Sequence, residues 1–357
     1  MVYTFSGILT VLLTAVMVKT KQYERKQLWI ITIITALPLF LVASLRYGIG
    51  TDYYEYIVLL KSFRYGTIKH TFSVNIEPLF YIMDRLTIRL FGTNYQWFFV
   101  VTAGVILFAI FYVIYRDSEN PVESTFLYLM MTFFLSSLNA IRQHMACCIL
   151  LLTLKYLYDN RPIKFSVGVI IAGLFHYSAF AFLIVYILKM IKVTPRKAIV
   201  LTTILFVLRG LVATIALTLL KYTRYARYLG GNVDYTTVGI LGLIIQLAIL
   251  LFASYYYHSC IENSCGRDAK IFEVLYGCQM MAVWCTMLSG VVPLISRVKW
   301  LFAYPSILLI PFILKKIPNW KERELIKFAI ICAFLIYYYI VVYVVGSYGV
   351  LPYRAIF

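Results

Sequence analysis

Long apolar stretches alternate with short polar segments along most of the chain. A helix that crosses the hydrocarbon of a bilayer needs about 20 mostly apolar residues, and several stretches reach or approach that length. They lie near residues 3–18, 28–45, 96–115, 124–139, 143–158, 165–189, 198–220, 237–257, 271–290, 299–314 and 326–346. The pattern predicts an all-α, polytopic transmembrane helical bundle with about 10–12 membrane segments. No soluble domain or linker interrupts it, so we expect a single transmembrane domain over residues 1–357.

The longest segment between two apolar stretches covers residues 46–95. Within it, residues 77–92 place apolar and charged side chains at helical spacing, which predicts an amphipathic helix along a membrane interface. Pro78 suits the first position of that helix, and the preceding Glu77 is an anion near a helix N-terminus. A purely structural role for Glu77 therefore stands beside any chemical one.

Composition excludes an ordinary soluble protein. Hydrophobic residues make up 62% of the 357 residues and charged residues only 13%, against about half and a quarter in soluble domains. The net charge of +18 comes from short basic runs between apolar stretches, as in cytoplasmic loops under the positive-inside rule. This distribution argues against nucleic-acid binding and predicts a multi-pass protein in a lipid bilayer.

The basic loops also define an expected orientation. Residues 19–27 and 315–327 are both basic and should both lie inside, but uninterrupted crossings by every stretch would separate them. Residues 165–189 have basic flanks on both sides and Phe175-His176-Tyr177-Ser178 in the middle. We therefore expect a broken or re-entrant helix at 165–189 with His176 near its tip. The alternative is one straight helix that violates the charge rule.

That orientation places 46–95, the turn near 139–143, the loops 221–236 and 291–298 and the tail 347–357 outside. The first apolar run lacks a basic segment before it and is expected to stay as a helix rather than to be a cleaved signal peptide. Most of the seven cysteines lie in apolar stretches, where cysteine behaves as a small hydrophobe. His258, Cys260 and Cys265 share a loop without a fourth ligand, so we expect no metal and no cofactor.

Arginines cluster at the expected outer helix ends, where the positive-inside rule predicts few basic residues. They are Arg46, Arg142, Arg224, Arg297 and Arg354. Each alone can be a snorkelling anchor, but together they can bind phosphate oxygens, because a guanidinium forms paired hydrogen bonds with phosphate. Tyrosines such as Tyr53 can either anchor the protein at the lipid headgroups or stack on sugar rings.

Several short blocks carry a resemblance to a known family. The first is Arg46-Tyr47-Gly48-Ile49-Gly50-Thr51-Asp52-Tyr53. The others are Glu77-Pro78-Leu79-Phe80, Ile141-Arg142-Gln143-His144-Met145-Ala146, Phe175-His176-Tyr177-Ser178-Ala179 and Ser296-Arg297. In order and spacing these blocks resemble the EpsG family of Wzy-type polysaccharide repeat-unit polymerases.

The resemblance implies a GT-C-like glycosyltransferase of the bacterial inner membrane, with its active site on the outer face. Such an enzyme joins oligosaccharide repeat units carried on undecaprenyl pyrophosphate into O-antigen, capsule or exopolysaccharide, and a separate co-polymerase sets the chain length. The leaving pyrophosphate needs charge stabilisation more than a proton, so arginines can replace a metal.

Specific roles follow from that chemistry as hypotheses. Arg46, Arg142 and Arg297 are expected to bind the donor pyrophosphate. The general base for the acceptor hydroxyl is expected to be Asp52, then His176, then Glu77. Additional substrate contacts are expected from Arg224, Arg354 and Tyr53.

Two other classes remain open. A lipid-linked oligosaccharide flippase or other transporter typically shows repeated halves and midplane charges, and neither is evident. An O-antigen ligase or membrane acyltransferase is the other alternative, but a ligase typically has its dominant outer loop late in the chain. Here the longest one, 46–95, comes early.

Overall fold

The computed structural model describes residues 1–19, 27–65, 76–222, 226, 240–264, 266–292 and 295–357. All regular structure in these ranges is helical, apart from one isolated β-bridge between Arg46 and Ala355. The all-α prediction is therefore confirmed. The chain packs as two compact units, and the expectation of one domain over 1–357 stays a prediction. The first unit comprises Met1–Thr153, Val167–Phe180 and Asn319–Phe357, and the second comprises Leu154–Ser166 and Ala181–Pro318.

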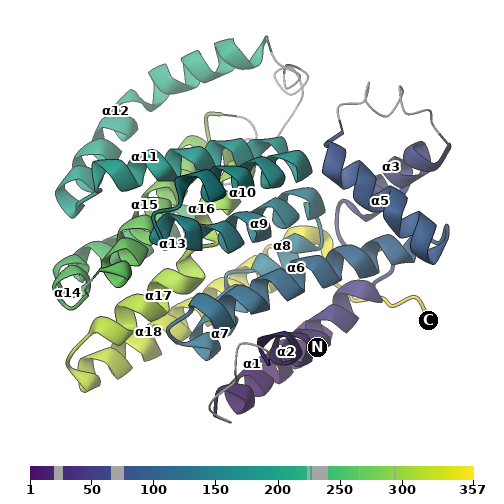
Figure 1. Ribbon diagram of the computed structural model, residues 1–357, viewed down its shortest axis with the longest axis horizontal. Coiled ribbons are helices and arrows are strands. Elements are labelled where there is room, and N and C mark those ends of the chain that lie inside the picture. Colours follow the sequence, from purple (N-terminus) through teal and green to yellow (C-terminus); the bar gives the residue numbers. More distant parts are fainter. Residues whose placement is uncertain (20–26, 66–75, 223–225, 227–239, 265, 293–294) are drawn as a thin grey trace. The chain divides into compact units, whose positions relative to one another are not determined.

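The first unit is built around the long helix α6 (Gln96–Asp117). Helix α2 (Leu28–Ser44) packs along α6, and α1 (Val2–Lys19) packs on both α2 and α7 (Pro121–Met130) (Figure 1). The other helices of this unit are α3 (Tyr53–Tyr65), α5 (Pro78–Phe91), α8 (Phe133–Ser137), most of α9 (Ile141–Tyr158), the later part of α10 (Pro162–Phe175), α18 (Trp320–Tyr339), the π-helix η3 (Ile340–Val344) and the 3-10 helix η4 (Ser347–Gly349).

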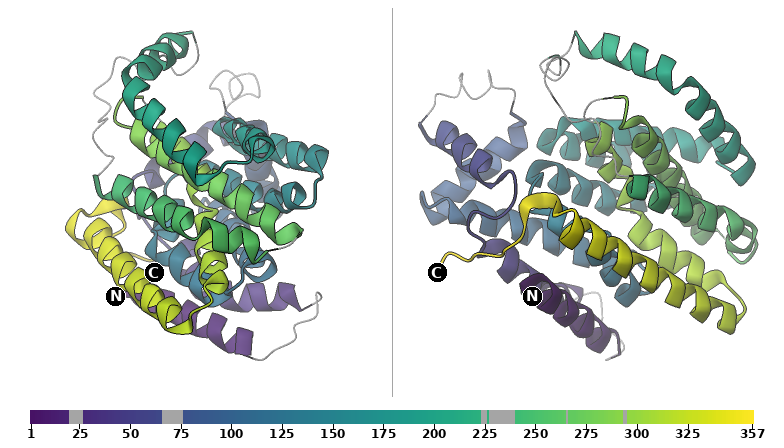
Figure 2. Two further views of the ribbon diagram at one scale, coloured as in Figure 1. Left: turned by 90° about the vertical axis from the view of Figure 1, so that its left-hand side faces the viewer. Right: turned by 180° about the vertical axis from the view of Figure 1, so that it is seen from behind.

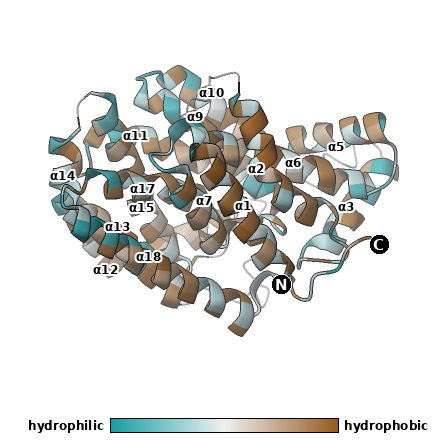
Figure 3. Ribbon diagram, turned by 90° about the horizontal axis from the view of Figure 1, so that it is seen from below, coloured by the Kyte–Doolittle hydropathy of each residue, from teal (hydrophilic) through white to brown (hydrophobic). Residues whose placement is uncertain are grey.

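Six described helices are long and apolar enough to cross a membrane. They are Val2–Lys19, Gln96–Asp117, Pro195–Leu220, Arg267–Leu288, Ile295–Lys316 and Trp320–Val344, and four shorter apolar helices accompany them. Figure 3 shows hydrophobic residues along most of α1 and α2, and many of their large apolar side chains are exposed. Since water does not tolerate such a surface and lipid does, the fold is that of a polytopic membrane protein.

Polar side chains inside the apolar helices bond to their own backbone. Thr10 and Thr14 donate to the carbonyl oxygens of Ser6 and Thr10, each at 2.8 Å, and Thr35 donates to that of Ile31 at 2.8 Å. These hydrogen bonds satisfy hydroxyl groups that lipid cannot solvate.

Local capping explains where α7 begins, and an unusual residue explains where it ends. The Asn120 side chain accepts hydrogen bonds from the N–H groups of Val122 and Glu123, with Pro121 in the first turn. Thr132 then has φ +62°, which ends α7 before the short α8. The apolar stretch 124–139, expected to be one segment, is therefore two helices joined at a kink.

The predicted break in 165–189 is confirmed. Helix α10 ends at Phe175, a 3-10 helix η1 covers Tyr177–Leu183, and α11 covers Ile184–Ile191. Near the end of α11, Lys189 Nζ donates to the carbonyl oxygen of Leu157 and to Asn160 Oδ1, both at 2.7 Å. These partners lie just before α10, so the end of α11 is close to the start of α10. The segment therefore forms a hairpin with His176 at the break.

The second unit is centred on α15 (Arg267–Leu288). Around it pack α11, α12 (Pro195–Leu220), α13 (Ile240–Tyr255), α14 (Tyr257–Glu262), α16 (Ile295–Ala303) and α17 (Ser306–Lys316). Gln279 of α15 donates from Nε2 to Gln246 Oε1 of α13 at 2.9 Å, which links two apolar helices by a buried bond. Arg209 of α12 is exposed, with its guanidinium carbon 4.9 Å from the centroid of the Phe206 ring.

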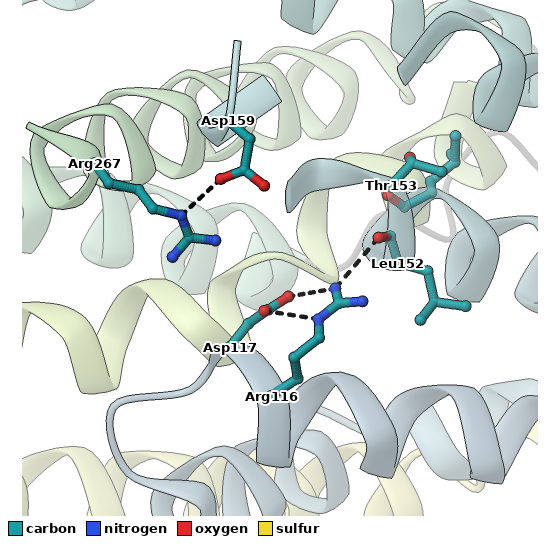
Figure 4. A network of polar contacts seen from close by, with 7 residues as sticks. Arg116, Asp117, Leu152, Thr153, Asp159 and Arg267 are labelled. Atoms are coloured by element: carbon teal, nitrogen blue, oxygen red, sulfur yellow. Dashed lines mark hydrogen bonds and ion pairs between the residues drawn. The ribbon is translucent and has the colours of Figure 1, made fainter. Parts of the chain in front are cut away.

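Figure 4 shows an ion pair in each unit. In the first, Arg116 Nη2 lies 2.5 Å from Asp117 Oδ2 and also donates to the carbonyl oxygen of Leu152 at 3.2 Å. In the second, Arg267 Nε lies 2.8 Å from Asp159 Oδ1. Both pairs lie at helix ends. A further ion pair of the first unit joins Lys327 of α18 to Glu123 in the first turn of α7, with 3.0 Å between Nζ and Oε1.

Candidate functional site

A buried carboxylate lies between two basic side chains in the first unit. Glu77 Oε2 accepts a hydrogen bond from Arg142 Nη1 at 2.7 Å, and Glu77 Oε1 lies 3.0 Å from His176 Nδ1. Glu77 is only 2% exposed, whereas the side chains of Arg142 and His176 keep 31% and 16% of their surface. We call these three residues the Glu77 cluster. It unites three blocks that are far apart in the sequence.

Local structure places each member of the Glu77 cluster at the end of a helix. Glu77 has an extended backbone immediately before Pro78 of α5, and its side chain makes no capping bond to that helix. Arg142 occupies the second position of α9. His176 follows the last residue of α10, and its carbonyl oxygen accepts from the N–H of Ala179 as the chain turns into η1.

The electrostatics keep Glu77 ionised. Burial would raise its pKa, but the hydrogen bond from His176 and the charge of Arg142 outweigh burial and lower the pKa to about 2. An ionised carboxylate can only accept hydrogen bonds, so Nδ1 of His176 must carry the proton that it shares with Glu77. In the neutral ring the lone pair is then on Nε2, the nitrogen directed away from Glu77.

Aromatic side chains surround Arg142. Its guanidinium carbon lies 5.7 Å from the centroid of the Phe80 ring, and the buried Tyr56 hydroxyl of α3 is a hydrogen-bond partner. Phe80 in turn contacts Phe98 at the start of α6, with centroids 5.6 Å apart. These contacts fix the guanidinium in one direction and exclude water from the Glu77 side, which strengthens the ion pair.

A second arginine lies in a more closed environment. Arg46 is 2% exposed, donates from Nη1 to the carbonyl oxygen of Leu138, and lies 4.9 Å from the Phe99 ring centroid. Its Nε has no hydrogen-bond partner among the described residues, and Arg46 is one of the residues that line a cavity of about 10 Å³. Burial lowers its pKa to about 10, while Tyr3, Tyr56, Tyr53 and Asp52 act in the opposite direction, so it is cationic at neutral pH.

The turn after Arg46 is held by Asn139. Gly48 and Gly50 have φ +63° and +100°, conformations that favour glycine. The Asn139 Oδ1 atom accepts from Thr51 Oγ1 at 3.3 Å and from the Asp52 N–H at 3.4 Å. Asn139 thus positions Asp52, whose carboxylate accepts from Thr51 Oγ1 at 2.9 Å.

The C-terminal tail, residues 347–357, is bonded to the same turn. The N–H groups of Tyr47 and Gly50 donate to the carbonyl oxygens of Arg354 and Gly349, each at 3.0 Å. Asn139 Nδ2 donates to the carbonyl oxygen of Tyr348 at 3.0 Å. Figure 2 shows this yellow segment returning to the purple N-terminal region, where the Tyr3 hydroxyl donates to the carbonyl oxygen of Val350 at 3.1 Å.

Substitution of Gly50 by alanine is expected to lower the midpoint of thermal unfolding in detergent. A Cβ atom at Gly50 would lie 2.5 Å from Asn139 Oδ1, so the turn and Asn139 cannot keep their positions. Gly92→Ala is the matched control, because Gly92 also has a positive φ (+86°) but has open space around its missing side chain. Both variants would be purified and unfolded under the same conditions. Equal midpoints for the two variants would contradict the expectation.

The other residues that were expected to contact the substrate lie in different environments. Tyr53 is 3% exposed and stacks on Phe99 with centroids 4.6 Å apart, so its ring is in the packed interior rather than at a surface. The side chain of Arg354 is exposed, and Arg297 is exposed on α16 of the second unit. Arg224 lies outside the described residues. The proposed ligand roles of these arginines stay predictions.

Sequence reasoning did not single out Asn139 and Tyr56, and it placed the tail 347–357 on the outer side without predicting its bonds to the turn after Arg46. Asn139 lies in the predicted turn near 139–143 and Tyr56 follows Asp52 closely, but neither residue type signals a buried hydrogen bond by itself. Within the described ranges no group of three or more His, Cys, Asp and Glu side chains is arranged to hold a metal ion. Cys265, one member of the loop considered for a metal, lies outside those ranges.

Asp84 of α5 is a buried carboxyl outside the Glu77 cluster. It is fully buried, and neither oxygen has a hydrogen-bond partner in the described structure. The guanidinium of the nearby Arg64 instead bonds to the carbonyl oxygen of Thr93 and lies 4.0 Å from the Tyr95 ring centroid. Burial raises the Asp84 pKa to about 6, although the charges of Arg64 and Arg85 act to lower it.

Asp84→Asn is expected to stabilise the protein at pH 8. A carboxyl whose pKa is raised on folding contributes full stability below its unfolded pKa, and that contribution is lost as the pH rises through 6. The shift corresponds to a cost on the order of 3 kcal/mol at high pH. Thermal unfolding in detergent should therefore show a higher midpoint for Asp84→Asn at pH 8 and no difference at pH 4. Identical midpoints at pH 8 would argue against an ionised, uncompensated Asp84.

Fold and site together define a class: a multi-pass membrane protein with a buried, charged cluster at helix ends. The sequence matches the EpsG family over residues 28–355 of the 357. The chain therefore belongs to the EpsG family, the family of Wzy-type polysaccharide polymerases. No curated protein and no solved structure matches it. Family membership supports a role as a glycosyltransferase of the polysaccharide-polymerase type.

Proposed function

We propose that the protein polymerises oligosaccharide repeat units carried on undecaprenyl pyrophosphate, with His176 as the general base. The observation that carries the proposal is the contact of Glu77 with both Arg142 and His176. A carboxylate that fixes an imidazole through Nδ1 leaves Nε2 able to take a proton, which is the arrangement that general-base catalysis requires. This reading places His176 ahead of Asp52 and gives Glu77 a positioning role.

The reaction is a displacement at the anomeric carbon of the donor sugar. The acceptor hydroxyl oxygen forms a bond to that carbon while its proton passes to His176 Nε2. The bond between the anomeric carbon and the phosphate oxygen breaks, and its electron pair leaves with undecaprenyl pyrophosphate. The leaving group is then a stable anion, so positive charge nearby lowers the barrier without a metal.

Arginine supplies that charge in this proposal. Arg142 is held by Glu77 yet keeps 31% of its side-chain surface, so remaining N–H groups can reach a phosphate. The guanidinium of Arg46 is buried in the described structure. The residues that cover it must therefore move before it can contact a phosphate. Arg297 and Arg354 are exposed cations that can add further contacts.

We place the active site on the outer face of the bacterial inner membrane, with a co-polymerase as the partner that sets chain length. Support for this placement comes from hydrogen bonds within the first unit. They connect three segments that we expect on the same side of the membrane, namely 46–95, 139–143 and the tail 347–357. The bonds lie around Arg46 and Asn139. The O-antigen, capsule or exopolysaccharide identity of the product is open in this proposal.

The decisive test mixes the purified protein with a lipid-linked repeat unit and separates the products on a gel. A ladder of multiples of the unit is expected from the wild type and from His258→Ala, an exposed histidine of α14 that serves as the control. His176→Ala should give no ladder. Transport without polymer would indicate a flippase, and transfer of single units to another acceptor would indicate a ligase. Either result would overturn the proposal.

A further inference from the structure

The strongest feature that the proposed function leaves unused is an apolar groove between α2 and α6. It has a volume of about 440 Å³, within the usual range of ligand pockets, and its lining comes from α2 between Ile33 and Phe40 and from α6 between Gly104 and Phe108. Three lining side chains, Ile33, Leu37 and Val105, are 56%, 47% and 42% exposed. On two apolar helices, such a groove opens to lipid rather than to water.

Aromatic rings lie at one end of the groove. Phe108 lines the groove and stacks on Tyr112 with centroids 6.1 Å apart, and Trp29 contacts both rings at 5.1 and 5.8 Å. These residues lie near the start of α2 and toward the end of α6. A chain that follows the groove away from these rings runs toward the end of α2 and the start of α6.

The other end lies on the side of the arginines. Phe40 and Gly104 line this end, and they are closer in sequence to Arg46 and to the start of α6 than Ile33 and Phe108 are. Gln96, the first residue of α6, donates from Nε2 to the carbonyl oxygens of Ser44 and Arg46. Through the Phe98–Phe80 contact the start of α6 also reaches Arg142. The groove thus runs from an aromatic end toward the start of α6, which lies near two guanidinium groups.

We propose that this groove binds the isoprenoid chain of the lipid-linked substrate and thereby directs its pyrophosphate to the Arg46 and Arg142 end of α6. The inference rests on the proposed function and adds the site that recognises the carrier. An isoprenoid pyrophosphate has an apolar chain and a diphosphate at one end. The chain would contact the apolar lining of the groove, and the diphosphate would then lie at the end where Arg46 and Arg142 are. A membrane phospholipid has a shorter chain and is the competing occupant.

The test is photocrosslinking of a polyprenyl pyrophosphate that carries a diazirine on its chain to the purified, full-length protein. Peptide mass spectrometry should locate the crosslinks on residues 33–40 and 104–108, and excess undecaprenyl pyrophosphate should suppress them more strongly than equimolar phosphatidylglycerol. Leu37→Trp should reduce the crosslinks. Leu41→Trp is the matched control, because Leu41 lies on the same helix, is 45% exposed against 47% for Leu37, and does not line the groove.

A kinetic measurement separates this inference from the proposed function. Leu37→Trp should raise KM about tenfold or more for a substrate on a long prenyl chain, with no change for the same oligosaccharide on a short prenyl chain. Crosslinks suppressed equally by phospholipid, crosslinks elsewhere, or an equal effect on both substrates would overturn the groove assignment even if the wild type makes a ladder. Carrier-specific crosslinks without any ladder would instead overturn the polymerase proposal and leave the groove as a carrier site.

Discussion

Replacement of Glu77 by glutamine is expected to lower the polymerisation rate by about 10²–10⁴-fold, the usual contribution of a positioned general base. Glutamine has nearly the same size but no charge. It leaves Arg142 without its carboxylate partner and can present an N–H instead of an acceptor to His176 Nδ1. The imidazole then loses the tautomer that directs Nε2 to the acceptor hydroxyl. The measurement is the initial rate of ladder formation with a lipid-linked repeat unit.

Glu123→Gln is the matched control for this prediction. Glu123 also pairs with a basic side chain, 3.0 Å from Lys327, and belongs to the same unit, but it lies at the start of α7 rather than in the Glu77 cluster. We expect near-normal rates from Glu123→Gln. If Glu77→Gln kept more than about a tenth of the wild-type rate, the role assigned to His176 would lose its physical basis. A normal amount of each variant in the membrane is required for the comparison.

Deletion of residues 347–357 is expected to reduce polymer to background. The deletion removes the carbonyl partners of the Tyr47 and Gly50 N–H groups and the tail side of the β-bridge to Arg46. It also removes the Tyr348 carbonyl oxygen that orients Asn139. The turn that holds Arg46 and Asp52 then loses its support on one side, so Arg46 and Asp52 are no longer held in position.

Removal of Phe357 alone serves as the control for that deletion. Its side chain is 92% exposed, and the last backbone bond of the tail comes from the N–H of Ile356 to the carbonyl oxygen of Leu45. Polymer should be normal without Phe357 and absent without residues 347–357. A full ladder from the longer deletion would show that the tail bonds are dispensable.

The hydrophobic and charge patterns were sufficient to predict most of the fold. Apolar stretches of helical length became helices, and the helical spacing in 77–92 became α5. Basic residues on both sides of 165–189 predicted the hairpin, because like-charged flanks favour the same side of a membrane. The kink at Thr132 was missed, since a positive φ at a β-branched residue has no recognisable sequence signal.

The candidate site was only partly predictable. Pro78 correctly indicated that Glu77 begins a helix, but the carboxylate makes no cap and instead bonds to Arg142 and His176. These partners are 65 and 99 residues away in the sequence, and the chain has many arginines from which to choose. The substrate contact expected from the Arg354 side chain stays a prediction, while the hydrogen bond of its backbone carbonyl oxygen to the Tyr47 N–H was not foreseen.

The bonds between the tail and the turn after Arg46 have a consequence for biosynthesis. Ribosomes make the N-terminal end first, so Tyr47 and Gly50 are synthesised long before their partners Arg354 and Gly349. The turn therefore cannot be completed while the membrane helices between these segments are still being made. The N-terminal helices have to insert into the membrane before the turn after Arg46 reaches its final conformation.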